Sequence, residues 1–278
     1  MQISDSYLVT FSPTHTSKRI GEAIVQGVDE KSVHWVDVTH DTPAEVIIPA
    51  DALAVFTVPV YGGRVAPLAL KRMEAVRSAG GGPAVVVVVY GNRAYEKALE
   101  QLDAFVAQRG FQVVAGATFI GEHSYSSQRF PIAQGRPDAD DLAYARLFGE
   151  KIRSKIAGAP DRDHLYGVDV RKILRPRQPI FPLLRFIYKV VKWRKSGQAM
   201  QLAPVTDENL CTHCGRCVHL CPNAAIEKGD EQHTQADKCI RCCACVKGCP
   251  QGARTYDTPF AVFLHSCFKR EKENRIIL

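Results

Sequence analysis

The chain has 278 residues, of which 46% are hydrophobic and 23% are charged, and its formal net charge at pH 7 is +7. This apolar content can form a sizeable buried core, which excludes a disordered chain and suits one large domain or two modest ones. No uncharged apolar run approaches the roughly 20 residues that a membrane-spanning helix needs. Residues 1–11 lack the basic start and apolar stretch of a secretory signal, so we expect a cytoplasmic protein.

Residues 1–160 alternate between apolar, β-branched runs and amphipathic stretches. The runs predict five strands, at 7–11, 33–38, 54–60, 84–90 and 111–120. The stretches between them predict helices at 18–26, 67–78, 95–109 and 138–156. Five consecutive valines, Val85–Val89, are typical of a central strand that is buried on both faces. This alternation predicts an α/β domain built on a doubly wound parallel sheet.

Positive charge gathers in residues 171–195, which contain nine basic residues and no acidic one. Within a basic linker at 161–202, we predict an amphipathic helix at 183–195. Its apolar side chains are Leu183, Phe186, Ile187, Val190 and Val191, and the cations on another face are Arg185, Lys189 and Lys192. We expect the apolar face to pack on one of the domains. Docking of an acidic redox partner or peripheral contact with an anionic membrane are the alternatives, and no nucleic-acid-binding motif accompanies the charge.

The ten cysteines are concentrated in one region: none precedes residue 211, and nine lie between 211 and 249. A shift of 28 residues superimposes two copies of the motif C-x2-C-x2-C-x3-C-P. Three thiolates at this spacing bind one [4Fe–4S] cluster, whereas the fourth lies too far along the chain and binds the other cluster. We therefore assign one cluster to Cys211, Cys214, Cys217 and Cys249, and the other to Cys239, Cys242, Cys245 and Cys221.

Zinc sites or disulfides are the alternative interpretation of these cysteines. Zinc usually takes two separate pairs of ligands rather than four cysteines followed by proline, and disulfides are rare in the cytosol. The two spare cysteines, Cys243 and Cys267, are expected to be ordinary small apolar residues. Residues 203–256 resemble bacterial-type 2[4Fe–4S] ferredoxins, which implies a small α+β domain that transfers single electrons at low potential. A short polar and basic tail is expected at 257–278.

Four of the predicted strands end in loops that could bind a ligand. The first loop, Ser12–Ser17, is rich in hydroxyl groups and precedes a helix, so it could bind an anion, although Ser and Thr also cap helices without a ligand. The loops at 59–64 and 90–95 pair aromatic residues with glycine, and a further loop at 121–126 follows the fifth strand. Because ligands bind beyond the carboxyl ends of parallel strands, the loops predict a site for a planar, phosphorylated ligand.

Residues 1–160 resemble flavodoxins. The phosphate loop of that family, [T/S]-x-[T/S]-G-x-[T/S], corresponds to Ser12, Thr14 and Ser17 here, with His15 in the place of the glycine. The loops at 59–64 and 89–95 are similar to those that flank the isoalloxazine ring in flavodoxins fused to ferredoxins. The resemblance implies FMN bound by Ser12, Thr14, His15, Thr16, Ser17, Pro59, Val60, Tyr61, Gly62, Gly63, Tyr90, Gly91, Asn92, Arg93 and Tyr95.

The whole chain therefore resembles the flavodoxin–ferredoxin fusion electron carriers of anaerobic bacteria and archaea. The resemblance implies an electron-transfer protein that couples FMN to two low-potential [4Fe–4S] clusters and exchanges electrons with partner proteins. The alternative is an FMN-dependent reductase of a small substrate that the clusters supply with electrons. In that case His123, Tyr125 or Tyr61 would be the proton donor beside the flavin.

Overall fold

The computed structural model describes residues 2–28 and 32–278, and the chain divides into two compact units. The sheet unit comprises residues up to 121 together with 135–176 and 272–278. The cysteine unit comprises residues 122–134 and 177–271. These boundaries differ from the expected domains at 1–160, 161–202, 203–256 and 257–278. The loop at 122–134 belongs to the cysteine unit, whereas the C-terminal residues 272–278 belong to the sheet unit.

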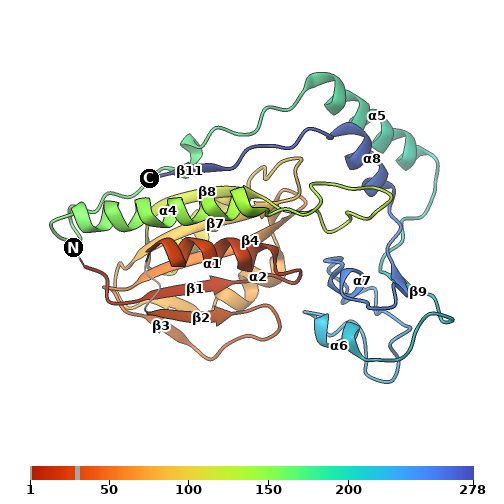
Figure 1. Ribbon diagram of the computed structural model, residues 1–278, viewed down its shortest axis with the longest axis horizontal. Coiled ribbons are helices and arrows are strands. Elements are labelled where there is room, and N and C mark those ends of the chain that lie inside the picture. Colours follow the sequence, from red (N-terminus) through yellow and green to blue (C-terminus); the bar gives the residue numbers. More distant parts are fainter. Residues whose placement is uncertain (1, 29–31) are drawn as a thin grey trace. The chain divides into compact units, whose positions relative to one another are not determined.

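Five parallel strands form the centre of the sheet unit (Figure 1). They are β1 (Ser6–Thr10), β2 (Val33–Asp37), β4 (Leu53–Tyr61), β7 (Pro83–Tyr90) and β8 (Gln112–Ile120). Their spatial order is β2-β1-β4-β7-β8. Counted among these five strands alone, this is the order 2-1-3-4-5 of the flavodoxin-like fold. The predicted doubly wound parallel sheet is therefore confirmed.

The centre of the sheet is the most apolar part of the unit. All eight residues of β7 are buried, as the run of valines predicts for a strand between two others. By contrast, β2 lies at the edge, and none of its five residues is fully buried. The core therefore lies between the middle strands and the helices that cover them.

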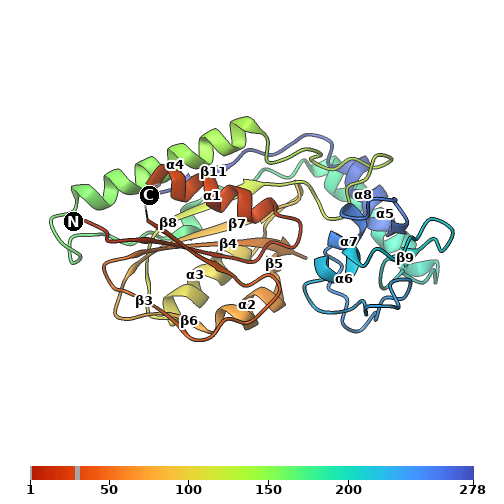
Figure 2. The ribbon, with the colours of Figure 1, turned by 60° about the horizontal axis from the view of Figure 1, so that its bottom comes forward.

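Two layers of helices cover the sheet (Figure 2). One face carries α1 (Thr16–Val28) and α4 (Ala139–Gly158), and the other carries α2 (Pro67–Met73) and α3 (Ala98–Gln108). The α1 and α4 backbones approach closely at two glycines: a Cβ on Gly27 would lie 2.0 Å from the Arg146 carbonyl oxygen, and one on Gly149 would lie 2.0 Å from that of Ile24. Only glycine fits at this crossing.

Two short strand pairs supplement the main sheet. The strand β5 (Arg64–Val65) folds back antiparallel on β4, and β3 (Val46–Ile48) pairs in parallel with β6 (Val76–Ser78). The helix predicted at 67–78 is therefore wrong in its second half, because residues 76–78 pair with β3 instead of extending α2.

The C-terminal residues are more structured than the predicted tail. They contain α8 (Pro259–Cys267) and β11 (Arg275–Ile277), and β11 pairs antiparallel with the edge strand β8. Asn274 fixes this strand, because its Oδ1 accepts a hydrogen bond from the Ile120 N–H at 2.9 Å and its Nδ2 donates to Asp141 at 2.6 Å. The same Asp141 forms the capping box of α4 with Asp138.

The cysteine motifs of the second unit are built from short elements, namely β9 (Val205–Thr206), α6 (Arg216–Leu220), α7 (Ala244–Lys247) and β10 (Arg254–Thr255). Equivalent hydrogen bonds recur 28 residues apart. The Asp207 N–H donates to the Ala253 carbonyl at 2.8 Å, and the Gln235 N–H donates to the Ala225 carbonyl at 2.8 Å. The sequence repeat is therefore also a repeat of structure, with a pseudo-twofold relation between its halves.

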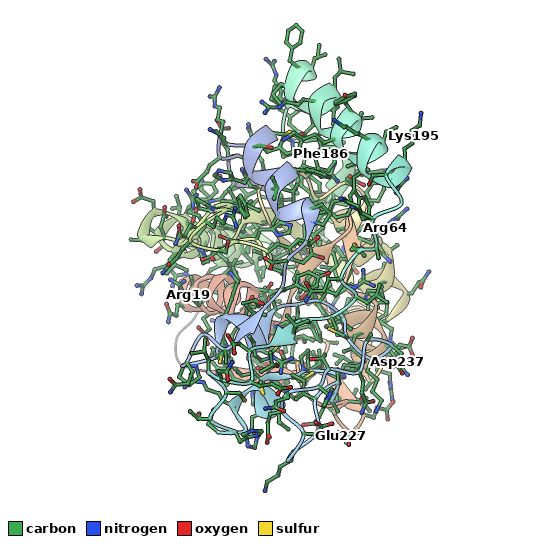
Figure 3. The ribbon with its side chains drawn as sticks, turned by 90° about the vertical axis from the view of Figure 1, so that its right-hand side faces the viewer. Arg19, Arg64, Phe186, Lys195, Glu227 and Asp237 are labelled. Carbon is green, nitrogen blue, oxygen red and sulfur yellow. The ribbon has the colours of Figure 1, made fainter. Side chains whose placement is uncertain are left out.

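The predicted basic helix is present as α5 (Ile180–Lys195), and a short 3-10 turn at Val170–Lys172 precedes it. Leu183 and Phe186 pack against Leu264, Cys267 and Phe268 at α8, so the spare Cys267 contributes to a small apolar core as expected. Figure 3 shows Phe186 and Lys195 on this helix. Among the described residues, no helix is both long enough and apolar enough to cross a membrane.

Candidate functional site

The first set of cysteines lines one pocket. Cys211, Cys214 and Cys217 come from the loop before α6 and from its first turn, and Cys249 comes from the segment after α7. The structure thus brings the distant cysteine of the second motif to the three clustered cysteines of the first. This is the arrangement that a ligand shared between the two copies requires.

The second set of cysteines lies closer to the interior. Burial raises the pKa of the Cys242 thiol to about 12 and that of Cys245 to about 11, and the neighbouring Cys221 and Cys239 contribute to both increases. These four thiols are therefore near enough to interact. Because burial disfavours the thiolates, they need a positive charge beside them, which iron would supply.

The loops around both sets repeat one backbone conformation. His213 and Gly215 have φ of 53° and 70°, and the equivalent Arg241 and Cys243 have φ of 57° and 59°. Left-handed residues of this kind turn successive N–H groups toward one point, where they bind anionic groups such as iron–sulfur centres. The repeated conformation, together with the thiol donors, fits a [4Fe–4S] cluster in each half.

The alternative of disulfides finds no support in this geometry. All ten cysteines are free thiols. A zinc site draws its ligands to about 2.3 Å from one ion. The first four thiols instead surround a pocket, which suits a larger group.

Arg254 is a buried cation beside both sets of thiols and was missed by the sequence analysis. It is 3% exposed, its Nη1 donates to the Glu231 carbonyl at 2.6 Å, and its Nη2 donates to the Thr234 hydroxyl. Burial raises the pKa of both Cys217 and Cys245, and the Arg254 guanidinium partly offsets each increase. Its Nε is buried without a hydrogen-bond partner among the described residues. A comparison of the two 28-residue copies could have singled out Arg254, because the equivalent residue in the first copy is the apolar Ile226.

The hydroxyl-rich loop forms a tight turn before α1. The Ser12 Oγ accepts a hydrogen bond from the Lys18 N–H at 3.0 Å, and the Ser12 N–H donates to the Thr39 hydroxyl at 2.8 Å. His15, which takes the place of the glycine in the flavodoxin motif, has a φ of 60°, a left-handed conformation that glycine adopts without strain. The hydroxyl groups of Thr14 and Thr16 are hydrogen-bonded to each other at 3.0 Å, and Ser17 is buried. The turn and the helix N-terminus that follows it fit a phosphate group.

The two glycine-containing loops lie side by side in the sheet unit. The Lys97 N–H donates to the Gly63 carbonyl at 3.1 Å, and a Cβ on Gly63, whose φ is 80°, would lie 2.3 Å from the Glu96 carboxylate. Gly62 is also left-handed, with φ of 59°. Pro59, Val60 and Tyr61, at the end of β4, are partly exposed beside this turn.

The loop after β7 holds its aromatic residues inside the unit. Tyr90 and Tyr95 are 1% and 4% exposed and meet edge to face, with ring centroids 5.5 Å apart. Asn92 is also buried, and its Oδ1 accepts a hydrogen bond from the Lys272 N–H at 3.0 Å. Gly91 and Arg93 are partly exposed. Tyr61 is therefore the candidate aromatic residue with an accessible ring in this unit.

His123 and Tyr125 belong to the cysteine unit, whereas the loops with which they were grouped in sequence belong to the sheet unit. The centroid of the Tyr125 ring lies 5.3 Å from that of Tyr256 and 4.9 Å from that of His123. Burial, together with the nearby Tyr256 and Cys243, raises the pKa of Tyr125. Their segment is tied to this unit by Glu122, which pairs with Lys247 at 2.6 Å.

Comparisons with known proteins find similarities in both parts of the chain. Residues 203–250 match the 4Fe-4S dicluster domain family. A tetrathionate reductase component from Archaeoglobus fulgidus is 45% identical over 49 residues, which are 16% of this chain and 24% of that protein, so the match spans about a quarter of the relative.

The solved structures of flavodoxins are similar over the other half. An archaeal flavodoxin, 14% identical, is covered over 99% of its length and 55% of this chain with a TM-score of 0.35. A Streptococcus pneumoniae flavodoxin is also 14% identical. It is covered over 99% of its length and 55% of this chain, with a TM-score of 0.40. The strand order described above is what establishes the fold. The chain therefore combines a flavodoxin-like sheet with a 4Fe-4S dicluster domain.

Proposed function

We propose that this chain is an electron-transfer protein that holds one FMN in the sheet unit and two [4Fe–4S] clusters in the cysteine unit. The observation that carries the proposal is the pocket in which Cys249 of the second motif joins Cys211, Cys214 and Cys217 of the first. When bound, FMN can exchange one or two electrons and each cluster exchanges one, so the protein could link electron-pair donors to single-electron acceptors.

The chain's own residues bind and tune these groups. Eight thiols hold the clusters, and the left-handed turns at 213–215 and 241–243 direct backbone N–H groups toward them. The loop at 12–17 binds the FMN phosphate, and the loops at 59–63 and 90–95 lie beside its ring. We place the protein in the cytoplasm, where reducing conditions keep thiols available for iron, and expect other redox proteins as its electron donors and acceptors.

Tyr125 gives little support to the alternative of an FMN-dependent reductase. Its ring is half-buried against Tyr256, and its raised pKa makes it a weak acid near neutral pH. His123 is engaged as well, since its Nδ1 accepts a hydrogen bond from the Tyr125 N–H at 3.0 Å. Of the three proton donors considered for an enzyme, the geometry therefore disfavours Tyr125 and His123 and leaves the partly exposed Tyr61.

A reductive titration under anaerobic conditions tests the proposed function. The protein should accept about four electrons per chain, two at FMN and one at each cluster. Flavin absorbance should bleach, and low-temperature EPR should show the reduced clusters. Uptake of about two electrons, with no flavin bleaching, would mean that only the two clusters are reduced. That result would contradict the FMN part of the proposal.

A pair of variants separates the two halves of the proposal. Ser12→Ala removes the oxygen that accepts the Lys18 N–H and should weaken FMN binding while leaving the iron content unchanged. Cys214→Ser should lower the iron content and leave FMN bound. If both variants lost both cofactors together, unfolding rather than ligand loss would explain the result, and circular dichroism would show it.

A further inference from the structure

The helix α5 has two apolar faces, and only one of them is packed. The inner face contributes Leu183 and Phe186 to the core with α8, and Trp193 meets Phe260 with ring centroids 5.7 Å apart. A second set of large apolar side chains, which we call the outer stripe, is exposed to between 44% and 84%: Ile180, Phe181, Leu184, Ile187, Tyr188 and Val191.

The outer stripe is continuous along the helix. At 100° per residue, its six members fall within about 120° of the circumference, roughly opposite the packed face. No residue in the described part of the chain covers it, because each member keeps more than two-fifths of its surface exposed. Water-soluble proteins rarely expose a contiguous apolar surface of this kind unless it binds something.

Cations border the stripe on both sides. Helical spacing places Arg185 and Lys192 along one edge and Arg194 beside the other, while Lys195 marks the C-terminal end (Figure 3). These four side chains make no ion pair with residues that the structure describes, and α5 contains no acidic residue. Lys189 differs, because it donates to the Ser266 hydroxyl at 2.7 Å on the packed side.

We propose that α5 docks the protein on an anionic membrane surface. The helix lies in the plane of the surface, the outer stripe enters the boundary between headgroups and acyl chains, and the bordering cations remain at the level of the lipid phosphates. A flat anionic surface matches a long, convex stripe with cations on both edges better than an acidic protein does. The stripe itself contains no charged side chain, and α5 carries only cations beside it, as in helices that lie in an anionic interface.

Vesicle flotation of the full, cofactor-loaded chain tests this proposal. At about 0.1 M salt, the protein should float with phosphatidylcholine vesicles that contain roughly 30 mol% phosphatidylglycerol and should remain below with pure phosphatidylcholine. Because each cation near an anionic surface contributes a factor of about five, Arg185→Gln with Lys192→Gln should reduce partitioning about 30-fold. Added salt should weaken binding in the same direction.

Variants of the stripe provide the second arm. Phe181→Ser with Leu184→Ser should reduce binding to anionic vesicles at least about tenfold, whereas the conservative Phe181→Trp should retain it. Leu147→Ser is the matched control, since Leu147 is 43% exposed on α4, in the sheet unit, and should leave binding unchanged. All three positions are exposed, so the melting temperature and the iron content should remain those of the parent protein.

Two results would overturn the proposal. One is a parent protein that does not float with anionic vesicles at about 0.1 M salt. The other is flotation that the serine variants and the glutamine variants leave unchanged. If the parent protein instead forms a stripe-dependent complex with an acidic redox protein and ignores vesicles, the stripe serves a protein partner and the proposal is wrong. The vesicle assay reads neither flavin nor iron, so its outcome is independent of the proposed function.

Discussion

Replacing Arg254 by methionine should make both clusters harder to reduce. Arg254 is buried and interacts with Cys217 of the first set of thiols and Cys245 of the second. Its positive charge favours the state with the added electron, so its removal lowers the reduction potential. Methionine has a similar length and no charge, which limits the change to the electrostatics and two hydrogen bonds.

The magnitude follows from Coulomb's law. A unit charge at about 7 Å in a medium with an effective dielectric constant of about 20 contributes about 2.4 kcal/mol. For a one-electron couple this corresponds to about 100 mV. Arg254 touches ligands from both sets, so the two potentials should fall together, each by about this amount.

The assay is a redox titration monitored by EPR under anaerobic conditions, with iron analysis of each sample. Arg254→Lys keeps the charge and should move both potentials by less than half as much. Lys228→Met is the control, because Lys228 is an exposed cation in the same unit, where water and salt screen its charge. Potentials that stay unchanged in Arg254→Met, at full iron content, would refute the role of this cation.

Three substitutions in the sheet unit test its packing through chemical denaturation. His15→Gly should stabilise the protein by about 0.5–1 kcal/mol, because glycine adopts the left-handed conformation without strain, and FMN should still bind; a lower free energy of unfolding would contradict the strained turn. Gly149→Ala should destabilise it by about 1–3 kcal/mol through contact with Ile24, whereas Gly158→Ala, in open space, should not; equal effects would contradict the close crossing. Asn274→Ala should cost about 2 kcal/mol, since it leaves the Ile120 N–H unpaired, and an unchanged midpoint would contradict this role of β11.

Local sequence patterns were enough to predict the main features of both units. The short, continuous run of β-branched residues in β7 is typical of a strand that is buried on both faces. The spacing of the cysteines likewise predicts which of them share a cluster. The expected repeat is also visible in the hydrogen bonds of Asp207 and Gln235, which lie 28 residues apart. In each case the signal lies within a few residues of the element that it predicts.

The features that were missed depend on distant partners. Three residues form β6 because β3 offers an edge, and three form β11 because β8 does, so neither strand has a pattern of its own. Similarly, the burial of Tyr90 and the place of Arg254 between two sets of thiols arise only when separate segments meet. Secondary-structure propensity and hydrophobic periodicity contain no information about such contacts between distant segments.

The central claim is that eight thiols hold two iron–sulfur clusters in a chain that also binds FMN. Analysis of iron, sulfide and flavin in the anaerobically isolated protein tests it most directly. The account predicts about eight iron atoms, eight sulfides and one FMN per chain. Zinc bound in place of iron, or a colourless protein that takes up neither iron nor flavin on anaerobic reconstitution, would contradict it.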